Sequence, residues 1–303
     1  MRFRKPARIV DNLWYLGVEE SGVYVLRGNS GTALISGGMS YILPDVLSQM
    51  RQFEINPAEI TTLLILHSHF DHVGIVPYFA AKYPAIKVLS SEAAIGTFQK
   101  PKAIEFINSY NILMAGNRIE TLKGFDLEWR SDITVHPVRE GDLIDLGGLE
   151  LGIFETPGHS NCAISAYEPN HKILFPSDAV GIPYGDRFFP AMNTNIDQFL
   201  SSLEKLKQLE VQLLCADHYG YITGEEAATA VQGTIREALG MRALLTEALV
   251  RNGNDIDAAA RWSVASTYDQ MPGYFLAREI LEGVLKQTLK YIKKVAGSEE
   301  RKA

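Results

Sequence analysis

TTLLILHSHFDH, residues 61–72, is the stretch that decides the fold of this chain. Its first six residues form an apolar run that is typical of a β-strand buried on both faces. On extended backbone, residues i and i+2 point to the same side, so His67 and His69 can reach one metal ion. Where the chain turns, Asp71 and His72 are directed to the other flank and can reach a second ion, while Gly74 allows a tight exit. Imidazole and carboxylate are ligands of Zn²⁺, Fe and Mn, so this stretch predicts a metal site at a strand end.

Further metal ligands are expected at the ends of later strands. His159 follows the Pro-Gly turn of TPGHS, Asp178 follows the apolar run KILFPS, and His218 follows VQLLCAD. The remaining two histidines are not expected to bind metal: His136 is predicted to be an ordinary strand residue, and His171 a solvated turn residue. The sequence therefore predicts seven ligands, which are His67, His69, Asp71, His72, His159, Asp178 and His218.

The rest of the chain alternates strands and helices, which indicates an α/β fold. Strands are expected at residues 9–16, 22–26, 32–36, 86–91, 133–138, 149–156, 162–167, 172–178 and 211–218, and helices at 44–53, 73–83 and 196–209. Residues 101–124 are expected to form a helical insertion. From Thr223 onward only helices are expected: Thr223 and Glu226 match a capping box, and Asn252-Gly253 provides a C-terminal stop. Two more helices are predicted at residues 255–264 and 274–295.

The ordered set His67-x-His69-x-Asp71-His72, followed by His159, Asp178 and His218, resembles the metallo-β-lactamase superfamily over roughly residues 9–222. The resemblance implies an αβ/βα four-layer sandwich of two similar halves, here with the helical insertion and a C-terminal helical extension. Residues 1–222 would form the catalytic domain, and residues 223–303 would form a helical region that caps the substrate. The plan looks most like the quinolone-signal response thioesterase and the glyoxalase II-like branches.

The resemblance also assigns the ligands to two divalent metal ions, Zn or Fe, with Mn as an alternative. His67, His69 and His159 would bind one ion. Asp71, His72 and His218 would bind the other, and Asp178 would bridge the two. A water between the ions would lose its proton and attack an acyl carbonyl. Asp71 is the expected catalytic residue, passing a proton as the intermediate collapses.

Departures from the family pattern narrow the activity. True β-lactamases lack a bridging aspartate, and flavodiiron reductases have Glu at the position of Ser68 and a flavodoxin domain. Bacillus-type acyl-homoserine lactonases have a tyrosine at the position of Gly181, although Tyr184 lies nearby. The usual Asp before Gly in the third strand is replaced by Ser36, which puts one contact to a metal ligand in doubt.

The substrate is expected to be a small molecule, most simply a thioester with an apolar or aromatic acyl group. The side chains expected to line its pocket are mostly aromatic; they are Tyr184, Phe188, Phe189, Met192, Tyr219 and Phe275. A basic stripe of Lys286, Lys290, Lys293 and Lys294 matches either phosphates of coenzyme A or a solvated helix end.

Two alternatives stay open: a lactonase or other ester hydrolase, and a ligand-binding regulatory protein that retains the metal site. With 46% hydrophobic residues and a net charge of −7, the chain is expected to be a cytoplasmic protein that binds neither nucleic acid nor membranes. Cys162 and Cys215 are expected to be buried thiols rather than a disulfide. The amphipathic tail and the insertion leave a homodimer open.

Overall fold

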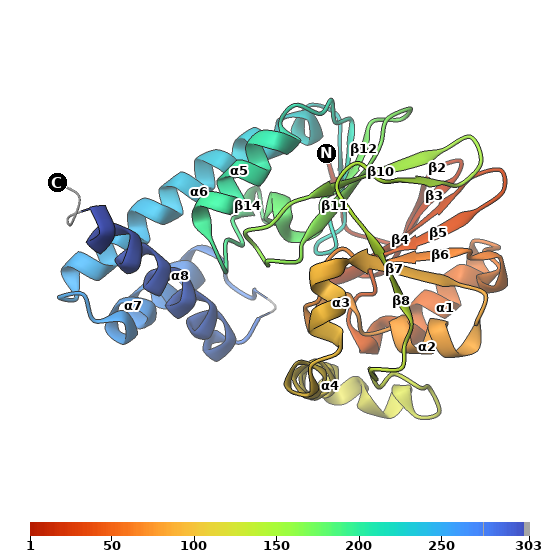
Figure 1. Cartoon of the computed structure of the whole chain (residues 1–303), viewed down its shortest axis with the longest axis horizontal. Helices are drawn as coiled ribbons and strands as arrows, with labels where there is room; N and C mark the ends of the chain where they lie inside the picture. Colours follow the sequence, from red (N-terminus) through yellow and green to blue (C-terminus); the bar gives the residue numbers. More distant parts are fainter. Residues whose placement is uncertain (275, 300–303) are drawn as a thin grey trace. The chain divides into compact units, whose positions relative to one another are not determined.

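The apolar run of residues 61–66 begins strand β6 (Thr62–Leu64), which lies inside a seven-stranded sheet of the computed structural model (Figure 1). β6 is buried along its whole length and pairs in parallel with both of its neighbours. A strand in this position buries both faces, which is why its sequence is continuously apolar. The strands of this sheet, in spatial order, are β2 (Ala7–Val10), β3 (Leu13–Val18), β4 (Ser21–Arg27), β5 (Thr32–Ile35), β6, β7 (Lys87–Ser91) and β8 (Val135–Val138).

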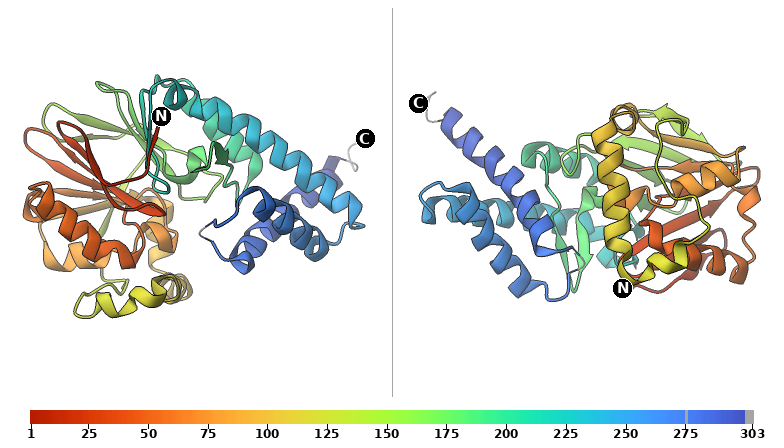
Figure 2. Two further views of the ribbon diagram at one scale, coloured as in Figure 1. Left: turned by 180° about the vertical axis from the view of Figure 1, so that it is seen from behind. Right: turned by 90° about the horizontal axis from the view of Figure 1, so that it is seen from below.

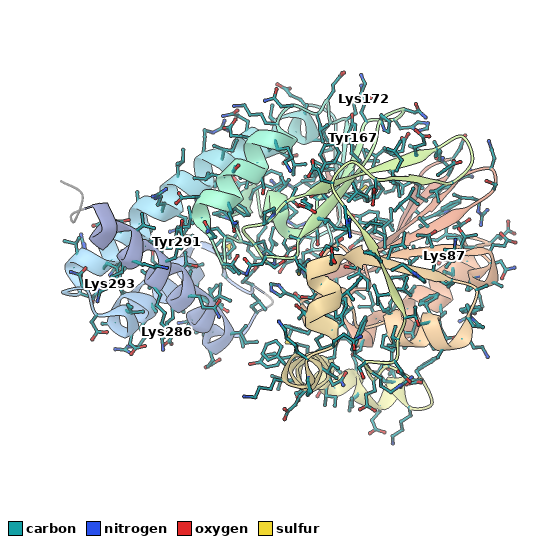
Figure 3. All side chains as sticks on the ribbon, viewed as in Figure 1. Lys87, Tyr167, Lys172, Lys286, Tyr291 and Lys293 are labelled. Carbon is teal, nitrogen blue, oxygen red and sulfur yellow. The ribbon has the colours of Figure 1, made fainter. Side chains whose placement is uncertain are left out.

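A second sheet also has seven strands among the residues described, which are 1–274 and 276–299. Most of its pairs are antiparallel, but β12 and β15 run parallel, with Ile173 opposite Leu213 and Leu174 opposite Leu214. Its strands, in spatial order, are β1 (Arg2–Phe3), β16 (Tyr221–Thr223), β15 (Leu213–Cys215), β12 (Ile173–Phe175), β11 (Ile164–Glu168), β10 (Glu150–Glu155) and β9 (Leu143–Asp145). Just before β12, Lys172 forms an ion pair with Glu210, and the hydroxyl of Tyr167 in β11 donates to the backbone oxygen of the same residue. Tyr167 and Lys172 are labelled in Figure 3.

The two sheets share one hydrophobic core. Leu26 and Ile35 from the first sheet belong to the same buried cluster as Ile164 and Leu213 from the second. Tyr24 is fully buried in this cluster, and its hydroxyl donates to the backbone oxygens of Ala216 and Gly220. The core is therefore a sandwich between sheets, with its polar hydroxyls satisfied by backbone.

Helices cover the outer face of the first sheet (Figure 1). Ile42 and Pro44 open α1, where the fixed φ of proline suits the first turn. The helical segments of this part are η1 (Ser40–Ile42), α1 (Leu43–Gln52), η2 (Pro57–Glu59), η3 (Phe70–His72), α2 (Val76–Lys82), α3 (Glu92–Phe98), α4 (Pro101–Ala115) and η4 (Gly116–Leu122). The predicted helical insertion at residues 101–124 is confirmed by α4 and η4.

The chain divides into two compact units. Both sheets and α1–α4 belong to the first unit, which consists of Met1–Glu155, Cys162–Ser177 and Glu210–Ala228. The second unit consists of Thr156–Asn161, Asp178–Leu209 and Thr229–Ala303. The C-terminal helices thus share a unit with two segments from the middle of the chain.

The second unit is largely helical. Its elements are the hairpin β13 (Ile182–Tyr184) and β14 (Arg187–Phe189), then α5 (Ile196–Leu206), α6 (Glu225–Arg251) from Thr229 onward, α7 (Ile256–Gln270) and α8 (Arg278–Glu299), with η5 (Ser177–Val180) at its border. α7 and α8 pack along each other (Figure 2), and Lys286 of α8 forms ion pairs with Asp257 and Glu282. Lys293 donates to the carbonyl oxygen of Asn254. These two lysines (Figure 3) therefore connect α8 with the first turn of α7 and with the loop before it.

Some predicted elements differ from those observed. The strand expected at residues 9–16 is broken by a turn at Asp11 and Asn12, which makes β2 and β3 a hairpin. Thr223 is the last residue of β16 and pairs with Leu213, so it does not cap α6. Glu226 instead forms an ion pair with Arg2. The prediction of a capping box is wrong, because Thr223 belongs to β16 and not to the N-terminus of α6.

No helix among the described residues is both long and apolar enough to cross a membrane.

Candidate metal centre

The loop after β6 carries the first four predicted ligands. The rings of His67 and His69 lie with their centroids 4.6 Å apart, and those of His67 and His72 lie 4.0 Å apart. The chain then turns through η3 and leaves past Gly74, where a Cβ would lie 2.1 Å from the backbone nitrogen of Ser40. Only glycine fits this approach, so the loop is held tightly against the backbone after β5.

Asp71, His72 and His218 form a buried cluster within the first unit. The Nε2 atoms of His72 and His218 are 3.2 Å apart. The Oδ2 atom of Asp71 lies 3.6 Å from His72 Nε2 and 3.5 Å from His218 Nε2. Three potential ligand atoms from two distant parts of the chain thus face one small volume.

The contacts of the other ring nitrogens indicate which nitrogen of each imidazole carries the proton. His218 Nδ1 lies 2.6 Å from the carbonyl oxygen of Glu20, which can only accept, so His218 Nδ1 carries the proton. His72 Nδ1 lies 2.8 Å from Oδ2 of Asp217 and donates to that carboxylate. In the neutral rings, both Nε2 atoms then direct lone pairs toward each other and toward the Asp71 carboxylate. Such a set of donors fits a divalent cation, and orienting partners on Nδ1 are typical of histidine ligands.

The second unit contains the other two predicted ligands. His159 Nε2 lies 3.3 Å from Asp178 Oδ2, and both side chains are buried. His159 Nδ1 donates to the carbonyl oxygen of Ala191 at 2.7 Å, which again directs Nε2 toward the carboxylate. Gly158 sets the ring in place: its φ is +130°, and a Cβ there would lie 2.3 Å from the backbone of Phe199.

The seven predicted ligands therefore occur as two sets. His67, His69, Asp71, His72 and His218 lie in the first unit, and His159 and Asp178 lie in the second. The two other histidines match their interpretation: His136 is an exposed strand residue of β8, and His171 is a half-exposed turn residue bonded to Glu168.

Two polar residues beside the ligands were missed by the sequence reasoning. Asp217 accepts the hydrogen bond from His72, and the Ser177 hydroxyl donates to Asp217 at 2.6 Å. Asp217 directly precedes the predicted ligand His218, and Ser177 directly precedes Asp178. This adjacency in the sequence is the signal that could have identified them. Ser36, whose contact to a ligand was in doubt, is fully buried with φ of 70°, and its hydroxyl has no hydrogen-bond partner in the described structure.

Burial strongly affects the thiol next to this network. Cys215 is fully buried, and burial followed by the nearby Asp217 charge raises its pKa well above the usual range. Cys162 is also buried, and its Sγ lies 3.2 Å from the Ser68 hydroxyl. Both cysteines are buried, as the sequence predicted, and the described structure contains no disulfide between them.

Three of the residues predicted to line a substrate pocket surround one cavity in the second unit. Tyr184, Phe188 and Phe189 of the β13–β14 hairpin line a cavity of about 470 Å³, together with Met241, Leu244 and Met271. This volume is within the range of small-molecule sites. Its lining also includes the ion pair of Arg187 with Glu237.

Two other predicted pocket residues, Met192 and Tyr219, are not part of the lining of this cavity. Met192 is buried, and its backbone oxygen accepts a hydrogen bond from Thr288. Tyr219 belongs to the first unit, with φ of 58° and Arg4 over its ring. Phe275 lies outside the described residues.

Comparison with known proteins identifies the family to which this fold belongs. The family model described as the metallo-β-lactamase superfamily matches residues 16–218. A hydroxyacylglutathione hydrolase from Legionella pneumophila (strain Paris) is 23% identical over 186 residues, which are 61% of this chain and 59% of that protein. An acyl-coenzyme A thioesterase, MBLAC2 from Gallus gallus, is 26% identical over 66% of this chain and 71% of its own length.

Solved structures share the architecture. A metallo-β-lactamase family protein from Thermus thermophilus aligns with a TM-score of 0.66 at 18% identity, covering 95% of this chain and 96% of the other. An archaeal superfamily protein from Sulfolobus tokodaii aligns with a TM-score of 0.59 at 20% identity, covering 76% and 87%. The predicted sandwich fold with its helical insertion and helical extension is confirmed. The chain belongs to the metallo-β-lactamase superfamily of hydrolases.

Proposed function

We propose that this hydrolase uses two divalent metal ions to cleave thioesters that carry an apolar or aromatic acyl group. The observation that carries the proposal is the cluster of His72, His218 and Asp71. Its two imidazoles are locked by Glu20 and Asp217 in the tautomer that presents Nε2 to a cation. Ligand side chains held in this way before the ion arrives are typical of catalytic metal sites.

The proposed assignment follows the order of ligands in the superfamily. His67, His69 and His159 would hold one ion. Asp71, His72 and His218 would hold the other, and Asp178 would be a ligand shared between them. Zn²⁺ and Fe suit this set of imidazoles and carboxylates, and Mn²⁺ is compatible with it.

When bound, such ions supply an activated water near neutral pH and stabilise the developing charge on the acyl oxygen. The chain supplies orientation and proton transfer. The buried Asp71 carboxylate faces both Nε2 atoms through one oxygen, Oδ2. In the proposal, the Asp71 carboxylate takes the proton of the attacking water and returns it to the departing thiolate.

Two observations support a thioester substrate. Among the relatives, one is named as a thioesterase and another as a hydrolase of an acylated glutathione. The cavity lined by Tyr184, Phe188 and Phe189 offers an apolar lining and enough volume for an acyl group. Gly181 disfavours a lactonase of the Bacillus type, because a side chain at this position would meet the backbone of Phe189 at 2.6 Å.

A substrate panel tests the proposal. Metal-loaded protein is assayed against thioesters with acetyl, octanoyl and benzoyl groups, the matching oxygen esters, and acyl-homoserine lactones. The proposal expects the octanoyl and benzoyl thioesters to have the highest kcat/KM, and His69→Ala to abolish their turnover. Faster cleavage of lactones would overturn the thioester assignment. The regulatory alternative would be favoured if the protein hydrolysed none of these substrates and if its effect in cells were the same with and without His69→Ala.

A further inference from the structure

A continuous chain of hydrogen bonds links two predicted ligand histidines through Ser177 and Asp217. His67 Nδ1 lies 3.1 Å from the Ser177 hydroxyl oxygen, which lies 2.6 Å from Asp217 Oδ2. The same Oδ2 atom lies 2.8 Å from His72 Nδ1. All four side chains are buried and belong to the first unit.

The strand register explains why these residues meet. β12 and β15 run parallel with a sequence offset of 40, since Ile173 is opposite Leu213 and Leu174 opposite Leu214. Ser177 and Asp217 have the same offset, so they leave the carboxyl ends of neighbouring strands side by side. That edge of the sheet therefore delivers a hydroxyl and a carboxylate to the ligand loop.

The direction of each hydrogen bond follows from donor chemistry. A carboxylate oxygen only accepts, so Ser177 and His72 both donate to Asp217. Ser177 has a single hydroxyl proton and has used it, so its oxygen accepts from His67 Nδ1. The Ser177 oxygen is also 3.4 Å from His72 Nδ1, a longer contact than the one to Asp217. One carboxylate thereby fixes both imidazoles with Nε2 unprotonated.

The surroundings of Asp217 and Ser177 lower the stability of the folded protein. Asp217 is buried, and its Oδ1 atom has no hydrogen-bond partner in the described structure. Ser177 has φ of 48°, a conformation that non-glycine residues rarely adopt. Buried charge and backbone strain at the same place are typical of a functional constraint.

We propose that Asp217 is a positioning residue for both metal positions. It orients His72 directly, and it orients His67 through the hydroxyl of Ser177. The inference rests on the proposed function, which assigns His67 and His72 to different ions. Loss of the Asp217 charge should then lower the affinity for both ions, whereas loss of the Ser177 hydroxyl should lower the affinity only for the ion assigned to His67. Asp217 acts through these histidines and does not itself contact substrate.

Zinc titration against a competing chelator tests the relay without any substrate. Wild type, Asp217→Asn, Ser177→Ala and Glu168→Gln are compared for stoichiometry and affinity, and each metal-free protein is also melted. Glu168 is the matched control, because it is a fully buried carboxylate that also lies 2.8 Å from a histidine Nδ1, that of His171. It serves a turn rather than a predicted ligand.

The expected result is a 10–100-fold loss of affinity for both zinc ions in Asp217→Asn. Ser177→Ala should lose affinity for one ion only, and Glu168→Gln should bind zinc like wild type but melt earlier. The metal-free Asp217→Asn protein should melt no earlier than metal-free wild type, which a merely structural residue would not allow.

Wild-type affinity for both ions in Asp217→Asn would overturn the relay, and so would equal losses in Asp217→Asn and Glu168→Gln. If Asp217→Asn does not fold, unchanged zinc binding by Ser177→Ala overturns the coupling. Failure of the proposed function is distinguishable: zinc would then bind and respond to the variants as expected, while the thioester panel shows no turnover.

Discussion

At the scale of single residues, Asp71 is the most direct test of the chemistry. Its Oδ2 atom is within 3.6 Å of two imidazole nitrogens, so the proposal makes it both a ligand and the proton carrier. Asp71→Asn keeps the volume and one carbonyl oxygen but removes the basic carboxylate. We expect kcat on the best thioester to fall by about 10²–10⁴-fold while part of the metal is retained. Steady-state kinetics with metal analysis of the same sample decides this, and near wild-type kcat would refute the role.

Cys215 gives a residue-scale prediction about pH. Because burial raises the pKa of its thiol, the folded protein keeps the thiol protonated where an unfolded chain, with a pKa of about 8.5, would ionise it. The contribution of the protonated thiol to the free energy of unfolding is fully present below about pH 8.5. It is lost progressively as the pH rises above that value, because the unfolded chain then releases the proton and the folded protein does not. We expect Cys215 to resist alkylation at pH 8 until the protein is unfolded. Mass spectrometry after iodoacetamide treatment measures this, and rapid native labelling of Cys215 would contradict its burial.

Candidate ligands could be proposed from the sequence, whereas the groups that orient them could not. HSHFDH places three histidines and an aspartate within six consecutive residues. A metal site can therefore be predicted from this motif without knowledge of the tertiary structure. Asp217 and Ser177 could not, because their meeting depends on the parallel register of β12 and β15. Two three-residue strands in a long chain do not specify that register by themselves.

At the scale of elements, the turn before His159 should be intolerant of change. At Gly158, φ is +130° and a Cβ would lie 2.3 Å from the Phe199 backbone at the start of α5. Gly158→Ala is expected to destabilise the protein by about 2 kcal/mol or more, because strain and overlap add. Thermal melts measure this.

Gly96→Ala is the matched control for Gly158→Ala. Gly96 lies in helix α3, and a Cβ there would meet nothing within 4 Å. Alanine should therefore stabilise the helix by about 0.5–1 kcal/mol. A Gly158→Ala protein as stable as Gly96→Ala would show that the turn is not constrained as described.

The ion pair between α7 and α8 gives a second element-scale prediction. A hydrogen bond from Lys286 lowers the pKa of Asp257. A lowered carboxyl pKa contributes stability above the unfolded value of about 3.9, and this contribution is lost as the pH falls through the folded value. We expect Lys286→Met to flatten the acid limb of the stability curve, with an effect that shrinks in high salt. Denaturant titrations at pH 3–7 measure it, and an unchanged acid limb would argue against the pairing.

Element boundaries were predictable where local chemistry sets them and not elsewhere. Asn252 and Gly253 mark the end of α6, and Gly253 and Asn254 indeed take left-handed conformations. Thr223 was misassigned because a capping residue and a strand residue look alike locally. The tertiary pairing with Leu213 decides between them.

At the scale of the whole molecule, the fold was predictable and the second unit was not. The order of ligands indicates the sandwich, whose two sheets share one core. No local signal tells that residues 156–161 and 178–209 group with the C-terminal helices. That grouping depends on contacts between segments far apart in sequence, such as Arg242 with Asp197 and Tyr291 with Asp197.

Metal removal should lower the stability of the folded protein. A ligand that binds only the folded state stabilises it by about 4 kcal/mol at a thousandfold excess over its Kd. We expect chelation followed by dialysis to lower the Tm by several degrees, and stoichiometric Zn²⁺ to restore it. Differential scanning fluorimetry shows the shift, and equal melting with and without metal would argue against a tight site.

The most direct test of the metal centre is the metal content of the protein purified without added metal, measured together with His72→Ala and His218→Ala. We predict about two equivalents of a divalent transition metal in the wild type. Each variant should lose at least one equivalent while it remains folded by circular dichroism. A folded wild-type protein that retains no divalent ion, or variants that retain the full amount, would contradict the proposed metal centre.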